Sequence, residues 1–371
     1  MKKVIAFMLS IMLLLSCTAI STGVAEAKKV NVVTTIFPIY DWVREAAGAE
    51  AEHIDLTLLL DNGVDLHSYQ PTAQDILKIS NADLFIYVGG ESDEWVEDVL
   101  RTAMNPSLKA INLVEAMGDD IKMEEIVEGM EHEHDHDHDH DEDHDHEDED
   151  HDHDEEHDHG HEDEDHDHED EDHDHEDEDH DHEEHDHDHE HEEEADEHVW
   201  LSLRNARKLT AVIADALAEI DPAAADHYKE NAAAYIEKLG ALDAQYTEAV
   251  SSAAFKTVLF GDRFPFRYLA DDYGLTYFAA FSGCSAESEA SFETVVFLTQ
   301  KMDELKLPAV LTIENPKTRL AETIVQNTAS KDQKILSMDS MQGTTSRDIQ
   351  AGVTYLSVME ANLNVLKEAL N

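Results

Sequence analysis

The sequence predicts an α/β protein with two lobes, each with a mainly parallel sheet flanked by helices, joined by one long backbone helix. Short apolar runs rich in β-branched residues alternate with stretches of helical period over 29–104, and the alternation returns over 258–370. Between the two series, 223–250 keeps apolar residues at helical spacing along its length. These observations together predict the fold class.

The first series opens with a β-branched run, 29–35, that ends shortly before Pro38. The sequence LFIYV over 84–88, ended by Gly89-Gly90, has the apolar continuity of a buried strand. The predicted strands are 29–35, 54–60 and 84–88, and the predicted helices are 40–47, 72–80 and 94–104. This repetition implies a mainly parallel sheet with helices on both of its faces.

Helical spacing resumes at 205–220, which Asp221-Pro222 closes, and the longer helix over 223–250 follows. The second series then begins. Its predicted strands are 258–260, 275–278 and 309–313, and its predicted helices are 291–305, 318–328 and 349–370. A cleft between two such lobes is the expected ligand site.

The charge of the chain is extreme and mostly local. The 371 residues have a formal net charge of -62, and 131–197 holds 43 of the 87 acidic residues and none of the 25 basic ones. Because no basic stripe is available to release counterions from a polyanion, nucleic acid is not an expected partner. Cations are the natural partners of such a chain.

The N-terminus predicts export. Two lysines precede an apolar run, 4–15, that is too short to span a bilayer comfortably. The sequence LLSC over 14–17 resembles a bacterial lipobox, which would make Cys17 the lipid-anchored first residue, whereas Ala25-Glu26-Ala27 resembles a cleavage site for soluble secretion. A cysteine directly after the apolar run favours the lipobox. It would leave Cys284 without a disulfide partner.

The chain accordingly divides into six segments. They are the signal and lipid-anchor segment 1–27, the N-terminal lobe 28–130, a His/Asp/Glu-rich loop 131–197, the N-terminal lobe continued 198–222, the linking helix 223–252 and the C-terminal lobe 253–371. The loop is expected to be disordered, because it has no apolar face whose burial could offset the entropy of ordering it.

The loop 131–197 carries the strongest sign of metal chemistry, since it holds 22 of the 26 histidines, mostly in His-Asp-His units. Neutral imidazole suits zinc, copper and nickel, and neighbouring carboxylates attract the cation. Exchangeable accessory sites are therefore expected, beginning with His132, His134, His136, His138 and His140. A solvated acidic linker without metal function would need no histidine.

Four histidines lie outside the loop. His53 and His227 stand in polar segments and are expected at the surface. His67 follows a predicted strand, and His198 precedes a predicted helix. Ligand-binding side chains concentrate in such connections, so these two are the candidate ligands, although a single histidine is more often structural.

As a set, these segments resemble the zinc/manganese solute-binding proteins of bacterial ABC importers, whose zinc members carry a His-rich loop between their first two ligands. The resemblance extends from 29 to 371. It rests on Gly-x-Asp-x-His-x-Tyr-x-Pro-Thr around His67, Asp-x-His-Val-Trp-Leu around His198, the pattern of 221–239, and Tyr268-Leu269 with Tyr273-Gly274-Leu275. It implies the metal-binding solute-binding fold, with His67 and His198 as the first two ligands and Asp339 as the fourth.

The third ligand departs from the family's pattern. The family has His or Glu five residues before the Tyr of the Tyr-Leu pair, where this chain has Arg263, and a guanidinium has no lone pair for a metal. Asp262 is the adjacent candidate, with Cys284 and Glu287 as alternatives, and a thiolate would favour zinc over manganese. Otherwise Arg263 pairs with a carboxylate, and the site consists of two histidines, Asp339 and water.

Together with this resemblance, which implies the transport role, the sequence predicts capture of Zn²⁺ by a monomeric extracytoplasmic protein, attached to the membrane by lipid. It would pass the ion to an ABC permease while the loop collects metal. The alternatives are a manganese-binding protein, for which a His-rich loop is a poor choice, and a surface zinc store. A zinc hydrolase is not expected, because the sequence has no HExxH or comparable motif.

Overall fold

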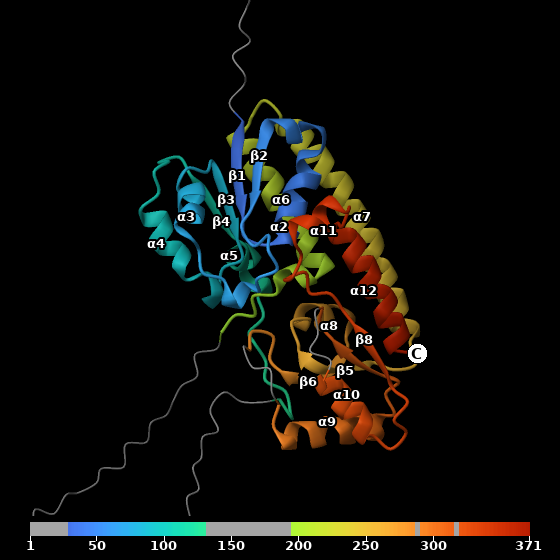
Figure 1. Cartoon of the computed structure of the whole chain (residues 1–371). Helices are drawn as coiled ribbons and strands as arrows, with labels where there is room; N and C mark the ends of the chain where they lie inside the picture. The colour runs from blue at the N-terminus through green and yellow to red at the C-terminus, as the bar shows by residue number, and fades with distance from the viewer. Residues whose placement is uncertain (1–28, 131–193, 286–289, 315–318) are drawn as a thin grey trace, which may run out of the picture. The chain divides into compact units, whose positions relative to one another are not determined.

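The computed structural model describes residues 29–130, 194–285, 290–314 and 319–371 (Figure 1). The predicted signal segment with Cys17, the accessory histidines from His132 to His140, and Glu287 lie outside the described residues. The boundaries of the six predicted segments therefore stay predictions.

A four-stranded parallel sheet forms the first half of the fold. Its strands are β1 (Val30–Thr34), β2 (Ile54–Leu58), β3 (Leu84–Tyr87) and β4 (Lys109–Asn112), in the order β2-β1-β3-β4. The central strands β1 and β3 are apolar, as is usual for parallel strands that are covered on both faces. Their residues Val32, Val33 and Phe85 are fully buried. The helices of this half are α2 (Phe37–Ala47), α3 (Ala73–Ser80), α4 (Trp95–Arg101), α5 (Leu113–Met117) and α6 (Leu203–Ile220).

The second sheet repeats the strand order of the first. Its strands are β5 (Thr257–Arg263), β6 (Thr276–Phe281), β7 (Ala309–Thr312) and β8 (Lys334–Ser337), in the order β6-β5-β7-β8, and every pair is parallel. The helices of this half are α8 (Arg267–Tyr273), α9 (Phe292–Leu305) and α10 (Arg319–Asn327). Helix α11 (Ser346–Gln350) follows β8 in the chain but lies beside the first half, where the Ser346 amide donates to the Asp61 carbonyl at 3.0 Å (Figure 1). In both sheets the strand order reverses between the two central strands, because successive strands are added first on one side and then on the other. Ligands of such folds bind beyond the carboxyl ends of those strands.

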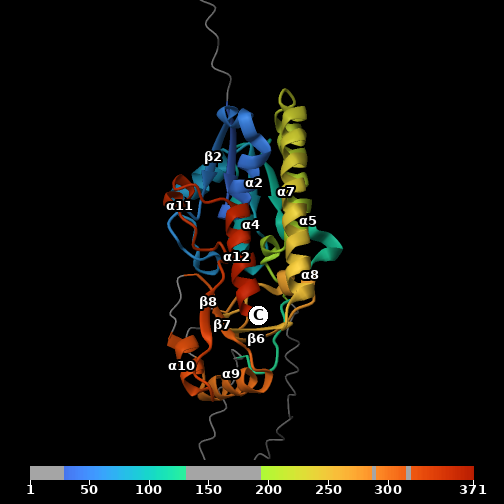
Figure 2. The same cartoon turned by 90° about the vertical axis from the view of Figure 1, so that its right-hand side faces the viewer.

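Two long helices connect the halves. Helix α7 (Ala225–Ser252) packs against α2 and α6 of the first half and reaches α8 of the second (Figure 2). The last helix, α12 (Tyr355–Ala369), packs against α7, α2, β7 and β8, and the hydroxyl of Tyr246 on α7 donates to the Met359 carbonyl at 2.6 Å. The apolar face predicted for α7 is buried at Tyr228, Ala232, Tyr235, Leu239, Leu242, Tyr246 and Val250.

The two parallel sheets are confirmed, although the sequence does not predict every element. Strands β4 and β8 escape prediction because each is four residues long, starts with lysine and is largely half-buried or exposed. The single helix predicted over 349–370 is wrong. Helix α11 ends at Gln350 and α12 starts at Tyr355, because the Thr354 side chain accepts the Ser357 amide and caps a new helix. None of the helices in the described ranges is long and apolar enough to cross a bilayer.

Candidate metal centre

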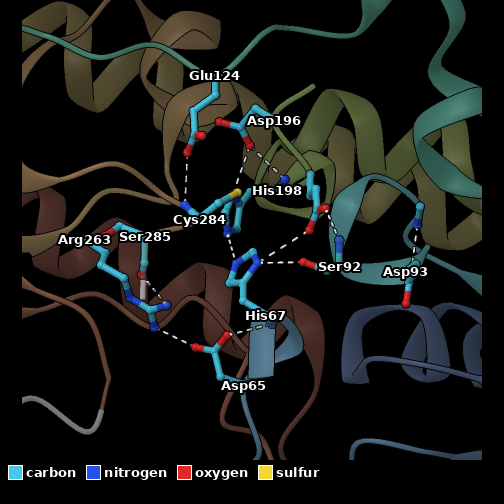
Figure 3. Close-up of polar contacts among 12 residues, drawn as sticks. Asp65, His67, Ser92, Asp93, Glu124, Asp196, His198, Arg263, Cys284 and Ser285 are labelled. Atoms are coloured by element: carbon cyan, nitrogen blue, oxygen red, sulfur yellow. Dashed lines mark hydrogen bonds and ion pairs between the residues drawn. The ribbon is translucent and has the colours of Figure 1, made fainter. Parts of the chain in front are cut away.

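Potential metal ligands from both sheets meet at one place. Within the described residues, the one group of three or more such side chains with ligand atoms within 4.8 Å of one another is His67, His198 and Cys284. Figure 3 shows the three side chains together. His67 lies in a 3-10 turn, Leu66–Ser68, after β2, whereas His198 immediately precedes a second such turn, Val199–Leu201, that leads into α6. Cys284 follows β6 of the second sheet.

The two ring nitrogens of His67 have different surroundings. Nδ1 lies 2.8 Å from the Ser92 hydroxyl and 3.6 Å from a carboxylate oxygen of Glu197. Nε2 faces Nε2 of His198 at 3.3 Å. Burial, together with the charges of His198 and Arg263, lowers the pKa of His67 to about 3. The ring is therefore neutral at neutral pH, which is the state that binds metals.

His198 has the same arrangement. Its Nδ1 lies 3.0 Å from Oδ1 of Asp196, which also accepts the backbone amide of His198 at 2.8 Å. The side chain is fully buried, and its ring lies 5.1 Å from that of Trp200. A carboxylate at Nδ1 fixes the proton there and turns the Nε2 lone pair towards the site, which is how histidine ligands are commonly oriented.

The loop that carries Cys284 passes close to the His198 ring at Gly283. A Cβ on Gly283 would lie 3.0 Å from Cε1 of His198, so only glycine lets this loop pass the ring without a shift. The amide of Cys284 donates to Glu124 at 3.1 Å. Burial and the nearby carboxylates of Glu124 and Glu197 raise the pKa of the thiol. A divalent cation would offset these effects, because a metal-bound cysteine is a thiolate.

Arg263, the residue at the family's third ligand position, pairs with a carboxylate. Its guanidinium lies 2.6 Å from Oδ2 of Asp65 and donates to the carbonyl of Ser285 at 3.4 Å. The pairing with a carboxylate that the sequence left open is therefore present.

The predicted carboxylate ligands Asp262 and Asp339 are not members of the three-residue group. Asp262 accepts the backbone amides of Arg263 at 2.9 Å and Ile313 at 3.3 Å, and burial raises its pKa. Asp339 accepts the amide of Met341 at 2.7 Å, and burial together with the charge of Glu314 raises its pKa to about 6. Their role as ligands stays a prediction.

Four residues around the ligands were not predicted from the sequence. Asp196 and Glu197 fall at the end of the acidic loop as composition defines it, yet both are buried and lie beside the two histidine rings. Their position directly before His198 was the available signal. The Gln342 carbonyl oxygen lies 3.2 Å from Nε2 of His198 when its amide nitrogen faces Asp65. Neither Gln342 nor Ser92 carries a sequence signal of this role.

Two imidazole nitrogens and a thiol form a donor set for a late transition metal. Imidazole and thiolate favour zinc or copper, whereas manganese and magnesium favour oxygen ligands. Two nitrogens bound tetrahedrally to one zinc ion, each about 2.0–2.1 Å from it, are roughly 3.3 Å apart. The separation of the two Nε2 atoms, 3.3 Å, matches this value.

Comparisons with known proteins agree with this chemistry. The family model described as zinc-uptake complex component A, periplasmic, matches residues 32–369. The zinc-binding lipoprotein AdcA of Streptococcus pneumoniae is 32% identical over 99% of this chain, and the chain spans 61% of the length of that relative. The high-affinity zinc uptake system protein ZnuA of Bacillus subtilis is 26% identical over 97% of this chain and 94% of its own length.

Solved structures give the same match. The Zn(II)-bound ZnuA-like domain of Streptococcus pneumoniae AdcA superposes with a TM-score of 0.62 and 28% identity, covering 92% of this chain and 99% of that domain. A crystal structure of ZnuA, at 17% identity and a TM-score of 0.61, shares the fold.

Proposed function

The chain belongs to the family of zinc-uptake component A, solute-binding proteins of ABC transporters, and we propose that it captures Zn²⁺ outside the cytoplasm and delivers it to a membrane permease. The relatives named as zinc-binding and zinc-uptake proteins support zinc as the cargo. The chain spans 61% of the length of the AdcA relative, so the match covers part of that protein.

One observation carries the proposal. The two Nε2 atoms of His67 and His198 face each other at 3.3 Å, while both Nδ1 atoms are held by oxygen atoms. Two lone pairs at this distance repel unless a proton or a cation lies between them. Zinc fits there, with the Cys284 thiolate as its third ligand.

Three protein ligands leave one position of a tetrahedral zinc ion free, and water fills it in many such sites. The carboxylates of Asp262, Asp339 and Glu287 are the sequence-based candidates that compete with water. Chelator competition with single variants decides between these ligands. Weaker tight-site affinity in Asp262→Ala, Asp339→Ala or Glu287→Ala would identify the carboxylate, and parent affinity in all three would assign water.

The loop 131–197 is proposed to collect metal for this site. Its last two residues, Asp196 and Glu197, contact the rings of the two histidines, and Ala195 forms a β-bridge with Met123. Lipid attachment through Cys17 is proposed to keep the protein at the membrane, in line with the lipoprotein name of the Streptococcus relative.

The metal site is tested by zinc titration against a competing chelator, with the whole chain. The variant His67→Ala/His198→Ala should lose the tight stoichiometric phase, since two of the three ligands are gone. The matched control is His53→Ala/His227→Ala, which removes the other two histidines outside the loop and should titrate like the parent. A tight phase that survives in the first variant would contradict the assignment.

Delivery is tested separately, because a zinc store would bind equally well. Cells of the source organism that lack this gene should regain zinc uptake in zinc-poor medium when they carry the parent gene. The His67→Ala/His198→Ala gene should not restore it. Normal uptake without any gene copy would favour the storage role.

A further inference from the structure

Arg263 contacts the loops of two proposed ligands that belong to different sheets. Its guanidinium pairs with Asp65, two residues before His67, at 2.6 Å. It also donates at 3.4 Å to the carbonyl of Ser285, the residue after Cys284. Arg263 itself ends β5, so one side chain on the second sheet holds the His67 loop of the first half beside the Cys284 loop of the second (Figure 3).

Asp65 links Arg263 to the turn that carries His67. Its Oδ1 accepts the backbone amide of His67 at 3.1 Å, which fixes the turn that carries the ring. Both of its oxygens also lie within 3.2 Å of the Gln342 amide nitrogen once that amide is turned to satisfy both of its ends. The contacts of Arg263 therefore reach the turn that carries His67 and the residue next to Cys284.

The pair is placed where it can hold a defined geometry. The Arg263 side chain is 17% exposed and that of Asp65 is 27% exposed, so solvent screens their attraction less than at an open surface. The planar guanidinium offers several donors in fixed directions, which a lysine cannot do.

We propose that Arg263 is a positioning residue for the metal site, and that its guanidinium holds the His67 and Cys284 loops at the separation zinc requires. The inference rests on the proposed metal site. The inference gives a role to the arginine at the family's ligand position. Arg263 would bind no metal itself, but it would position the residues that do.

The test uses the whole chain and two readouts, tight-site zinc affinity and the thiolate-to-metal absorption band of the cobalt(II) complex. Arg263→Met should weaken zinc binding roughly 10- to 100-fold, the range found when outer-shell partners of metal ligands are lost. It should also diminish the cobalt–thiolate band at saturating cobalt. Arg263→Lys should recover part of both, because it restores the charge without the fork of donors.

A matched control separates positioning from a general loss of contact between the halves. Arg204 on α6 also joins the two halves, through Asp272 on α8 at 3.4 Å, but these helices carry none of the proposed ligands. Arg204→Met should therefore leave affinity and band unchanged. Asp65→Asn keeps an acceptor for the His67 amide and loses the ion pair. Its effect should not add to that of Arg263→Met, since both act through one contact.

Parent-like affinity and band in Arg263→Met, or an equal loss in Arg204→Met, would overturn the inference while leaving the metal site intact. A parent protein without a tight site or a thiolate band would instead overturn the proposed site, and the inference with it.

Discussion

Cys284 differs from the two histidines because it must lose a proton to bind metal. Burial and neighbouring carboxylates raise its thiol pKa, so the group is protonated at neutral pH and zinc has to displace the proton. Tight-site affinity should consequently rise about tenfold per pH unit around neutrality. Calorimetry in buffers of different ionisation enthalpy should show one proton released at the tight site by the parent and none by Cys284→Ala.

The loop 131–197 is the same in both proteins, so its own proton release cancels in this comparison. Equal proton release in parent and variant would remove Cys284 from the ligand set.

A buried acid that is not among the proposed metal ligands gives a second residue-scale prediction. Burial, only partly offset by Arg44, raises the pKa of Asp41 from 3.8 to about 6. As the pH rises from 3.8 to about 6, Asp41 loses its proton in the unfolded chain but keeps it in the folded chain. The contribution of Asp41 to stability is therefore complete below pH 4, declines as the pH rises to about 6, and is level above that. Over this range the free energy of unfolding should fall by roughly 3 kcal/mol through Asp41 alone.

Urea unfolding of the metal-free protein between pH 4 and 7 checks this expectation. Asp41→Asn should remove that part of the decline, because the amide does not titrate. An unchanged slope in the variant would show that Asp41 does not carry it.

Sequence reasoning found the residues of the site whose signal is local. His67 and His198 stand beside regular elements in recognisable motifs, and Cys284 and Arg263 were both named. What it could not give was the partner of Arg263, because Asp65 is 198 residues away and its pairing depends on how the halves meet. The same holds for Gln342, whose role comes from the fold alone.

Among the elements, β5 is the strand that positions Arg263, and it packs tightly against α10. A Cβ on Gly261 would lie 2.9 Å from Cα of Ala321 and 3.1 Å from a methyl group of Val310. Gly261→Ala should therefore destabilise the protein by about 1–3 kcal/mol, the usual cost of overpacking. Denaturant unfolding measures this, and tight-site zinc affinity should fall with it because Arg263 moves with the strand.

Gly240 in α7 is the control. The nearest atoms to an added Cβ belong to the flexible Arg207 side chain at 3.5 Å, so Gly240→Ala should stabilise the helix by about 0.5–1 kcal/mol. Destabilisation in both variants would mean that the substitution as such, and not the packing of β5, is responsible.

Elements with strong local patterns were predictable, and marginal ones were not. The apolar sequence LFIY of β3 and the regularly spaced apolar residues of α7 predict buried structure, and most of these side chains are buried. Strand β8, with the sequence KILS, is stable only because β7 pairs with it, and that support is absent from its own sequence. Helix α12 starts late for a local reason, the cap at Thr354, that a search for apolar period overlooks.

At the scale of the whole molecule, the number of zinc ions bound and the affinity of the tight site should depend on different parts of the chain. The parent is expected to bind several zinc ions per chain, because 22 histidines lie in 131–197. Replacement of 131–193 by a short Gly/Ser linker should leave one bound ion, since Asp196, Glu197 and the ligands remain. Equilibrium dialysis with metal analysis counts the ions, and chelator competition should give the parent affinity. Loss of the tight site would show that the loop supplies ligands.

The proposed ligands come from both sheets, and this has a consequence for the folding equilibrium. A cation bound by His67 and Cys284 fastens the two halves across their junction, so only the folded chain offers the complete site. By linkage, zinc at 100 times its dissociation constant adds about 2.7 kcal/mol to the free energy of unfolding. Resistance to heat and proteases would then follow the zinc supply, and chains short of zinc would be the ones cleared first.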